Sequence, residues 1–283
     1  MNVETWPDPA ALGTAAAAAA AESLRRTIDE RGTARLVLAA APSQLHTLAA
    51  LAVAEGIDWR RVEVFHMDEY VGLPPDAEQR FGQWLRRHFV NQVPPTDQLR
   101  STDRVLSSER VGRADQVGSG GRVGSGDQVG SGDRVRLAVI DPEGGAEPGA
   151  EAARYARLVS AAPIDIVLAG IGVNGHLAFN DPPADFSTTD VVQVVALDNT
   201  SRRQQVDEGL FGALDDVPTH AWTLTVPFLL SAREIFCMVS GPAKREAVRR
   251  TLAGPVDPAV PATALHTHPR TRLFLDLEAN PDE

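Results

Sequence analysis

The chain has 283 residues, of which 43% are hydrophobic and 23% charged, so its composition is that of an ordinary globular protein. Lys and Arg total 27 against 38 Asp and Glu, and the resulting net charge of −11 disfavours binding to a nucleic-acid backbone. The single cysteine, Cys237, excludes an internal disulfide and a thiolate zinc site, and a reducing, cytoplasmic setting is expected. No apolar run reaches the roughly 18 residues that predict a membrane span.

Short apolar runs alternate with amphipathic or alanine-rich segments along the chain. We expect strands at 35–40, 62–66, 164–170, 191–197, 222–226, 235–239 and 272–275, and helices at about 8–31, 44–55, 80–92, 147–161, 200–210 and 243–253. This alternation predicts a single α/β domain over residues 1–283, Rossmann-like, with a mostly parallel sheet flanked by helices and a small lid from loops around 181–200. Ligands of such sheets bind beyond the carboxyl ends of the strands, where we expect the chemistry.

One segment interrupts the alternation. The tetrapeptide VGSG starts at residues 117, 123 and 129, within a stretch of about 107–135 that is dense in Gly and Ser. A calcium-binding β-roll uses nine-residue Gly-Asp repeats, whereas this period is six and acidic side chains are few. The composition therefore predicts a flexible surface insertion without a bound metal.

Two adjacent acids follow the predicted strand at 62–66. The sequence VFHMDEYVGL places Asp68 and Glu69 just after the strand and before Gly72. Carboxylates at the carboxyl end of a parallel strand lie at the ligand-binding edge of the sheet. A solvated loop is the alternative interpretation of such a pair, and both residues are kept as candidate site residues.

A glycine-rich segment follows the predicted strand at 164–170. The sequence LAGIGVNGHLAFNDPP presents Gly172, Gly175 and His176 within five positions. Glycines at such a turn let a ligand approach the backbone, so Gly172 and Gly175 are candidate substrate-binding residues. His176 titrates near neutrality and can transfer protons, although a structural imidazole is the alternative. A dinucleotide fingerprint is disfavoured because no acidic strand end follows about 20 residues later.

Together these segments resemble a known enzyme family. HMDEYVGL and GIGVNGHLAFNDPP are similar to the two signature segments of glucosamine-6-phosphate deaminases (isomerases), and LAAAPSQ, HAWTLTVPFLLSA and GPAKREAV extend the resemblance over most of the chain. The resemblance implies conversion of glucosamine 6-phosphate to fructose 6-phosphate and ammonia, without a metal or organic cofactor. It also implies a small-molecule sugar phosphate as partner, and homo-oligomers are frequent in this family.

The resemblance also implies roles for individual positions. Asp68 matches the carboxylate that takes the C2 proton and passes it towards C1, and His176 matches the histidine that helps open the pyranose ring. Asp181 stands where the family usually has a glutamate that orients this histidine. Lys244 matches a lysine that contacts the phosphate, and Ser43 lies in the first strand-to-helix turn, where the family binds phosphate.

Besides Asp181, the chain departs from the family pattern in three places. Asn174 occupies a position where the well-known deaminases have an aspartate, and an amide can hold an imidazole but cannot stabilise its charge. The turn around Ser43 lacks the family's glycines and threonines. One phosphate-binding arginine of the family has no clear counterpart in this sequence, and Arg202 or Arg203 is the candidate for its role.

Two other functions stay open on the sequence alone. The sister 6-phosphogluconolactonases share the glycine-rich loop and its histidine, but they continue differently from AFNDPP, which disfavours a lactonase-type hydrolase. A catalytically altered sugar-phosphate sensor would bind the ligand without releasing ammonia.

Overall fold

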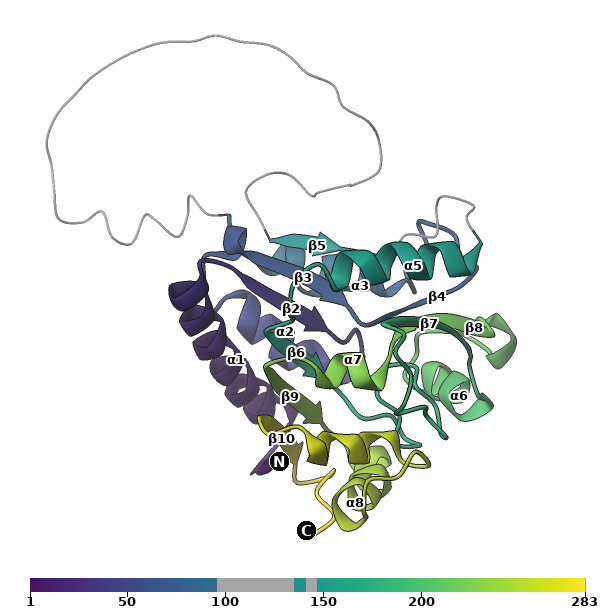
Figure 1. Cartoon of the computed structure of the whole chain (residues 1–283). Helices are drawn as coiled ribbons and strands as arrows, with labels where there is room; N and C mark the ends of the chain where they lie inside the picture. The colour runs from purple at the N-terminus through teal and green to yellow at the C-terminus, as the bar shows by residue number, and fades with distance from the viewer. Residues whose placement is uncertain (96–134, 141–146, 283) are drawn as a thin grey trace, which may run out of the picture.

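A seven-stranded parallel sheet forms the centre of the molecule (Figure 1). The computed structural model describes residues 1–95, 135–140 and 147–282, so nearly all of the predicted VGSG insertion lies outside the described residues. The strands of this sheet, in spatial order, are β1 (Asn2–Trp6), β10 (Thr271–Asp276), β9 (Glu234–Val239), β6 (Ile166–Ala169), β2 (Ala34–Leu38), β3 (Val62–His66) and β5 (Arg136–Ala138). Each neighbouring pair is parallel, which confirms the predicted fold class.

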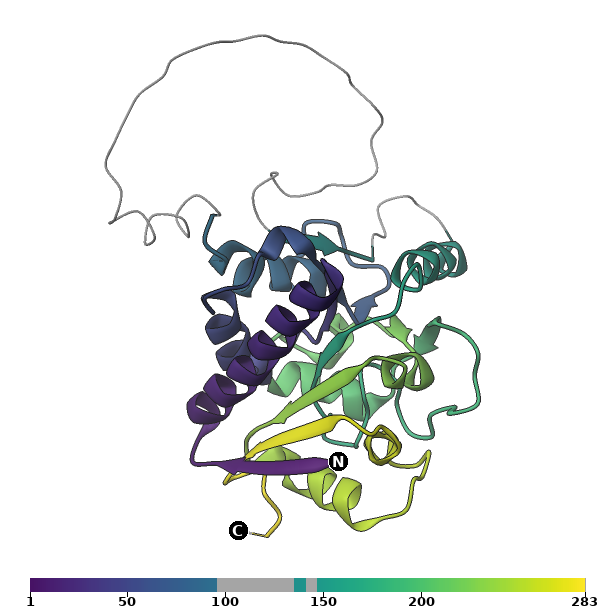
Figure 2. The ribbon, with the colours of Figure 1, turned by 60° about the vertical axis from the view of Figure 1, so that its left-hand side comes forward.

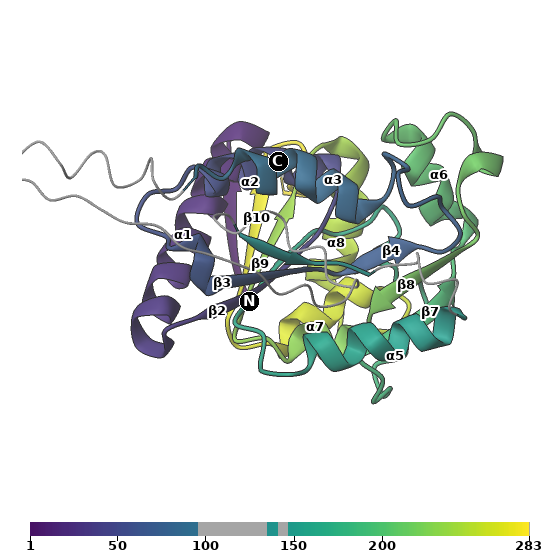
Figure 3. The ribbon, with the colours of Figure 1, turned by 90° about the horizontal axis from the view of Figure 1, so that it is seen from above.

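Helices cover both faces of the sheet (Figure 3). The described helices are α1 (Pro9–Arg31), α2 (Leu45–Ala52), α3 (Phe81–His88), α5 (Pro148–Val159), α6 (Asn199–Asp207), α7 (Val226–Leu230) and α8 (Arg245–Ala253). Figure 3 shows α1, α2 and α3 on one side of the sheet and α5 and α7 on the other. Two hydrophobic cores lie on the two faces of the sheet. Along β2, Leu36 and Leu38 belong to one core and Val37 belongs to the other, so both sides of the strand are buried. This explains why the strand has a continuous apolar run.

The chain reverses its direction across the sheet between β2 and β6. The strands β2, β3 and β5 follow one another towards one edge, and β6, β9 and β10 then proceed from β2 towards the other edge. The first strand, β1, pairs with the last, β10, so the two ends of the chain lie at the same edge (Figure 2). In open α/β sheets the ligand site lies beyond the carboxyl ends of the strands at this reversal.

A second sheet of three antiparallel strands lies beyond those carboxyl ends. Its order is β4 (Asp68–Tyr70), β8 (His220–Leu224) and β7 (Val192–Ala196). The segments 191–197 and 222–226 were expected in the parallel sheet, and that expectation is wrong. Burial alternates along β7, as in a strand with one exposed face, whereas a central parallel strand such as β2 is buried on both faces. The predicted lid around 181–200 is therefore part of a larger cap that includes β4 and β8.

The predicted helix at 8–31 is confirmed, and its ends follow from the sequence. Asp8 caps the first turn by accepting a hydrogen bond from the backbone N–H of Ala11 at 2.8 Å, and Pro9 occupies the first helical position. Gly32 ends the helix with a φ of 82°. No helix in the described part of the chain is both long and apolar enough to cross a membrane.

Candidate active site

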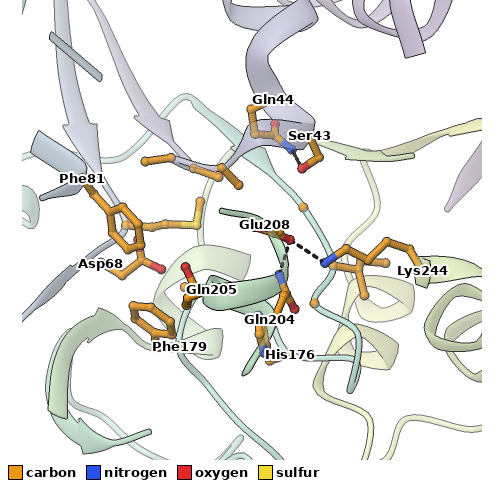
Figure 4. Close-up of a pocket in the computed structure, with 18 residues that line it drawn as sticks. Ser43, Gln44, Asp68, Phe81, His176, Phe179, Gln204, Gln205, Glu208 and Lys244 are labelled. Carbon is orange, nitrogen blue, oxygen red and sulfur yellow. Dashed lines mark hydrogen bonds and ion pairs between the residues drawn. The ribbon is translucent and has the colours of Figure 1, made fainter. Parts of the chain in front are cut away.

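A pocket opens at the carboxyl ends of β2, β3, β6 and β9, where the chain reverses (Figure 4). The empty space at this pocket, including the part open to solvent, is about 530 Å³. The polar side chains that line it come from four strand ends and from α6, and they are Ser43, Gln44, Asp68, His176, Gln204, Gln205, Glu208 and Lys244. The structure thus brings together four polar residues expected from the sequence, together with the backbone of Gly172.

Asp68 lies at the junction of β3 and β4 and faces the pocket. The residue is 7% exposed. Burial raises the pKa of its carboxyl group well above the ordinary value, and the neighbouring charge of Glu69 raises it further. A carboxyl group with a raised pKa is a stronger base and can also return a proton near neutral pH.

Glu69 points away from the pocket and caps α3, so its assignment to substrate binding is wrong. Its carboxylate accepts hydrogen bonds from the backbone N–H groups of Phe81 at 3.1 Å and Gly82 at 3.0 Å. Alternate residues of a strand face opposite sides, and Glu69 therefore faces away when Asp68 faces the pocket. Burial raises the pKa of Glu69 to about 7, although these donors and Arg80 favour its charged form.

The loop after β6 holds the imidazole of His176 over Gly172. A Cβ atom at position 172 would lie 2.1 Å from His176 Nε2, so only glycine leaves room for the ring. Gly175 turns the loop with a φ of 89°, and its N–H donates to the carbonyl of Gly172 at 2.9 Å. Gly175 does not line the pocket; it shapes the loop, in place of the expected substrate contact.

A hydrogen-bonded network behind the pocket fixes the other nitrogen of His176. Nδ1 lies 3.2 Å from Asp181 Oδ1 and 2.9 Å from Ser201 Oγ, and Ser201 also donates to Asp181. Asn174 donates to Asp181 Oδ1 at 3.1 Å, and its own carbonyl accepts from the backbone N–H of His176 at 3.1 Å. Burial alone would raise the pKa of Asp181, but these hydrogen bonds and the imidazole outweigh it and lower the pKa to about 2. The ionised Asp181 favours the tautomer with hydrogen on Nδ1, which leaves Nε2 as the acceptor.

Lys244 enters the pocket from the turn after β9 and meets Glu208, the residue that follows α6. Lys244 Nζ lies 3.3 Å from Glu208 Oε1, which also accepts from Gln204 Nε2 at 2.7 Å (Figure 4). Burial lowers the pKa of Lys244, and the charge of Glu208 partly offsets this. Lys244 is the one lysine or arginine among the described residues that line the pocket.

The turn after β2 carries Ser43 and Gln44. Gln44 Nε2 donates to Ser43 Oγ and to the carbonyl of Met238, both at 3.3 Å. The other side-chain atom of this amide, Oε1, is buried without a hydrogen-bond partner. A buried acceptor beside the pocket is available to a donor group of a ligand.

Comparison with known proteins identifies the family. A model of the family described as glucosamine-6-phosphate isomerases/6-phosphogluconolactonase matches residues 7–274. The chain belongs to this family. A glucosamine-6-phosphate deaminase from Staphylococcus epidermidis is 32% identical over 240 residues, which cover 84% of this chain and 81% of that protein. Another from Bacillus pumilus is 29% identical over 286 residues, covering 99% of this chain and 98% of that protein.

Solved structures agree with this assignment. A monomeric glucosamine-6-phosphate deaminase is 26% identical, with a TM-score of 0.77 and coverage of 99% of this chain and 98% of that one. A 6-phosphogluconolactonase from Shewanella baltica shares the fold at 19% identity, with a TM-score of 0.69 and coverage of 98% and 97%. The prediction that this chain is an enzyme resembling the deaminases of the glucosamine-6-phosphate isomerase family is confirmed.

Arg202 of this family member does not reach the pocket, so its assignment to phosphate binding is wrong. Its guanidinium donates to the carbonyls of Leu214 at 2.7 Å and Val217 at 2.9 Å, in the segment that follows α6. The residues that α6 does present to the pocket, Gln204, Gln205 and Glu208, were missed. The spacing of Gln204 and Glu208, four apart on one helical face, was the available signal.

Metal ligands were not expected from the sequence. Within residues 1–95, 135–140 and 147–282, no three or more His, Cys, Asp or Glu side chains are grouped closely enough to hold a metal ion.

Proposed function

We propose that this protein converts glucosamine 6-phosphate and water to fructose 6-phosphate and ammonia. The observation that carries the proposal is the pocket itself, in which a buried carboxylate with a raised pKa and an imidazole fixed by an ionised acid face one cavity. Aldose–ketose isomerisation requires these two groups, one to move a proton between carbon atoms and one to move a proton between oxygen atoms.

His176 opens the pyranose ring in this proposal. With Nδ1 donating to Asp181, Nε2 accepts the proton of the C1 hydroxyl as the bond between C1 and the ring oxygen breaks. The proton then passes to the ring oxygen, which becomes the C5 hydroxyl. The Asp181 carboxylate stabilises the imidazolium that exists between these two transfers.

Asp68 carries out the proton transfer between carbons. Its carboxylate removes the C2 proton of the open-chain aldehyde, O1 takes a proton from solvent, and an enolamine with a C1–C2 double bond forms. Protonation at C1 by the same group gives a C2 iminium. Water adds to this iminium and returns one proton to solvent, and ammonia then leaves as the C2 carbonyl forms. A positioned proton carrier of this kind contributes on the order of 10²–10⁴-fold to the rate.

The relatives support this choice within the family. The curated proteins of Staphylococcus epidermidis and Bacillus pumilus, which match over most of this chain, are both glucosamine-6-phosphate deaminases. The lactonase similarity lies below 20% identity and concerns the fold alone.

The test is ammonia release from glucosamine 6-phosphate by the purified protein and by Asp68→Asn. We expect the variant to lose at least about 100-fold in kcat with little change in substrate affinity, because the amide retains the shape and cannot accept the proton. Asp76→Asn, which removes an exposed carboxylate from the same loop region, is the matched control and should match the parent.

Two results would contradict the proposal. One is turnover of Asp68→Asn within threefold of the parent. The other is an absence of ammonia release by the parent together with hydrolysis of 6-phosphogluconolactone, which would assign the pocket to lactone hydrolysis.

A further inference from the structure

Glu208 is an unexpected group in a pocket for an anionic substrate. It lies just past the end of α6, and its side chain is 21% exposed while that of Lys244 is 9% exposed. Figure 4 shows Glu208 and Lys244 facing each other across the pocket end that lies away from Asp68. The carboxylate therefore neutralises the one lysine or arginine among the described residues that line the pocket.

The donors that hold Glu208 are those that a phosphate group would use. Glu208 Oε1 is held by the ammonium of Lys244 at 3.3 Å and by the amide of Gln204 at 2.7 Å. Charged carboxylates and phosphates accept hydrogen bonds from the same cationic and amide donors. Two anions cannot share these donors without mutual repulsion, which a partly buried site screens poorly.

We propose that Glu208 determines the specificity of this pocket by competing with the phosphate of the substrate for Lys244 and Gln204. The phosphorylated end of the substrate binds only when the carboxylate is displaced from these donors. Glu208 thus weakens the binding of phosphate dianions and reduces the preference of the enzyme for phosphorylated over unphosphorylated sugars. The identity of the phosphorylated substrate rests on the proposed function, whereas the competition at Lys244 does not.

The test compares Glu208→Gln with the parent by isothermal titration calorimetry, with inorganic phosphate, glucose 6-phosphate and glucose as probes. Glutamine retains an oxygen that accepts from Lys244 and Gln204 and removes the negative charge. We expect the Kd for phosphate and for glucose 6-phosphate to fall at least about tenfold, because one like charge is removed beside a dianion. The Kd for glucose should change less than about twofold, since a neutral sugar is not repelled.

Asp207→Asn is the matched control. Asp207 is the exposed neighbour of Glu208, so this change alters the net charge equally without touching the pocket, and its Kd values should equal those of the parent. Equal or weaker phosphate binding by Glu208→Gln would overturn the proposal, as would an absence of phosphate binding by both proteins. Failure of the deaminase proposal would appear separately, as a parent that binds glucose 6-phosphate but releases no ammonia from glucosamine 6-phosphate.

Discussion

Two aspartates of this site have pKa values shifted in opposite directions because their surroundings differ. Asp68 has few partners and a charged neighbour, and burial raises its pKa well above the ordinary value. Asp181 accepts hydrogen bonds from Asn174, Ser201 and His176, which together lower its pKa to about 2 despite burial. Carboxyl groups whose pKa values are separated in this way can take different roles, one as proton carrier and one as a permanent anion.

Asn174→Asp tests the charge balance behind the histidine. The new carboxylate would replace an amide donor that lies 3.1 Å from Asp181 and 3.4 Å from Asp198, so three acids would meet at one point. The lowered pKa of Asp181 means that its carboxylate stabilises the folded state at pH values above about 4, the pKa of an aspartate in the unfolded chain. This stabilisation is lost as the pH falls towards 2. We expect the variant to lose about 1–3 kcal/mol of unfolding free energy at pH 7 and less at pH 4, where protonation relieves the repulsion.

Urea unfolding at pH 7 and pH 4 measures this difference. Asn199→Asp, the same change at an exposed position of α6, should be nearly neutral at both values. An Asn174→Asp variant as stable as the parent at pH 7 would mean that the amide does not balance these acids.

Four of the residues that reach the pocket from strand ends were expected, Asp68 and His176 from the sequence pattern and Ser43 and Lys244 from the family resemblance, whereas Gln44 was not. Asp68, His176, Ser43 and Lys244 each follow a strand of the parallel sheet, and parallel strands bring their carboxyl ends to one edge. Glu208 was not found because its position depends on how α6 packs, which the local sequence does not specify. Arg202 was misassigned for the same reason, since its guanidinium donates to the carbonyls of Leu214 and Val217 and does not enter the pocket.

At the scale of elements, Glu69 connects the small sheet to α3. The helix lacks a side-chain cap of its own at Arg80, and the carboxylate of Glu69 accepts from the first backbone N–H groups instead. It also accepts from the N–H of Tyr70 at 3.0 Å. Glu69, the residue next to Asp68 in β4, is thus hydrogen-bonded to α3. This contact limits the movement of Asp68, the proposed proton carrier.

Glu69→Gln should change how stability depends on pH. Burial raises the pKa of Glu69 to about 7 from its ordinary 4.5, so its contribution to stability is complete below 4.5 and is lost as the pH rises through 7. A pKa shift from 4.5 to about 7 corresponds to about 3 kcal/mol in the free energy of unfolding once the pH is above 7. We expect the parent to lose stability relative to the variant between pH 4.5 and pH 8, as measured by urea unfolding at several pH values.

Glu30→Gln serves as the control for this series, because Glu30 lies on α1 and is exposed. A constant difference in stability between parent and Glu69→Gln over this pH range would contradict the raised pKa.

The pairing of strands was less predictable than their positions. Most strands and helices lie near their expected ranges, but β1, β4, β5 and α7 were not expected. β4 and β5 have three residues each, too few to show a period, and three of the five residues of β1 are polar. β7 and β8 were assigned to the wrong sheet because apolar content does not distinguish a parallel partner from an antiparallel one.

At the scale of the whole molecule, the site depends on a sheet whose two halves are joined at β2 and β6. The pocket receives Ser43 from the strand on one side of this junction and His176 from the strand on the other. A change that separates these strands should therefore abolish the site, whereas a change beyond the edge of the sheet should leave it intact.

Replacement of residues 118–132 by a short Gly/Ser connector tests this distinction. These residues lie outside the described part of the chain, and their Gly- and Ser-rich composition offers little apolar area to offset the entropy of ordering. The nearest described anchors, Val93 and Val135, are 1% and 3% exposed and are retained by the replacement. We expect the melting temperature to fall by less than about 4 °C, equivalent to about 1 kcal/mol, with ammonia release within about twofold of the parent.

A longer replacement that also removes residues 135–138 is the matched comparison. It deletes β5, which pairs with β3 through Val64 and Leu137, and it therefore uncovers the strand that leads to Asp68. We expect this protein to lose both stability and activity, because β3 would become an exposed edge next to the site. Equal losses from the two replacements would show that residues 118–132 pack against the body of the protein, contrary to the expectation from their composition.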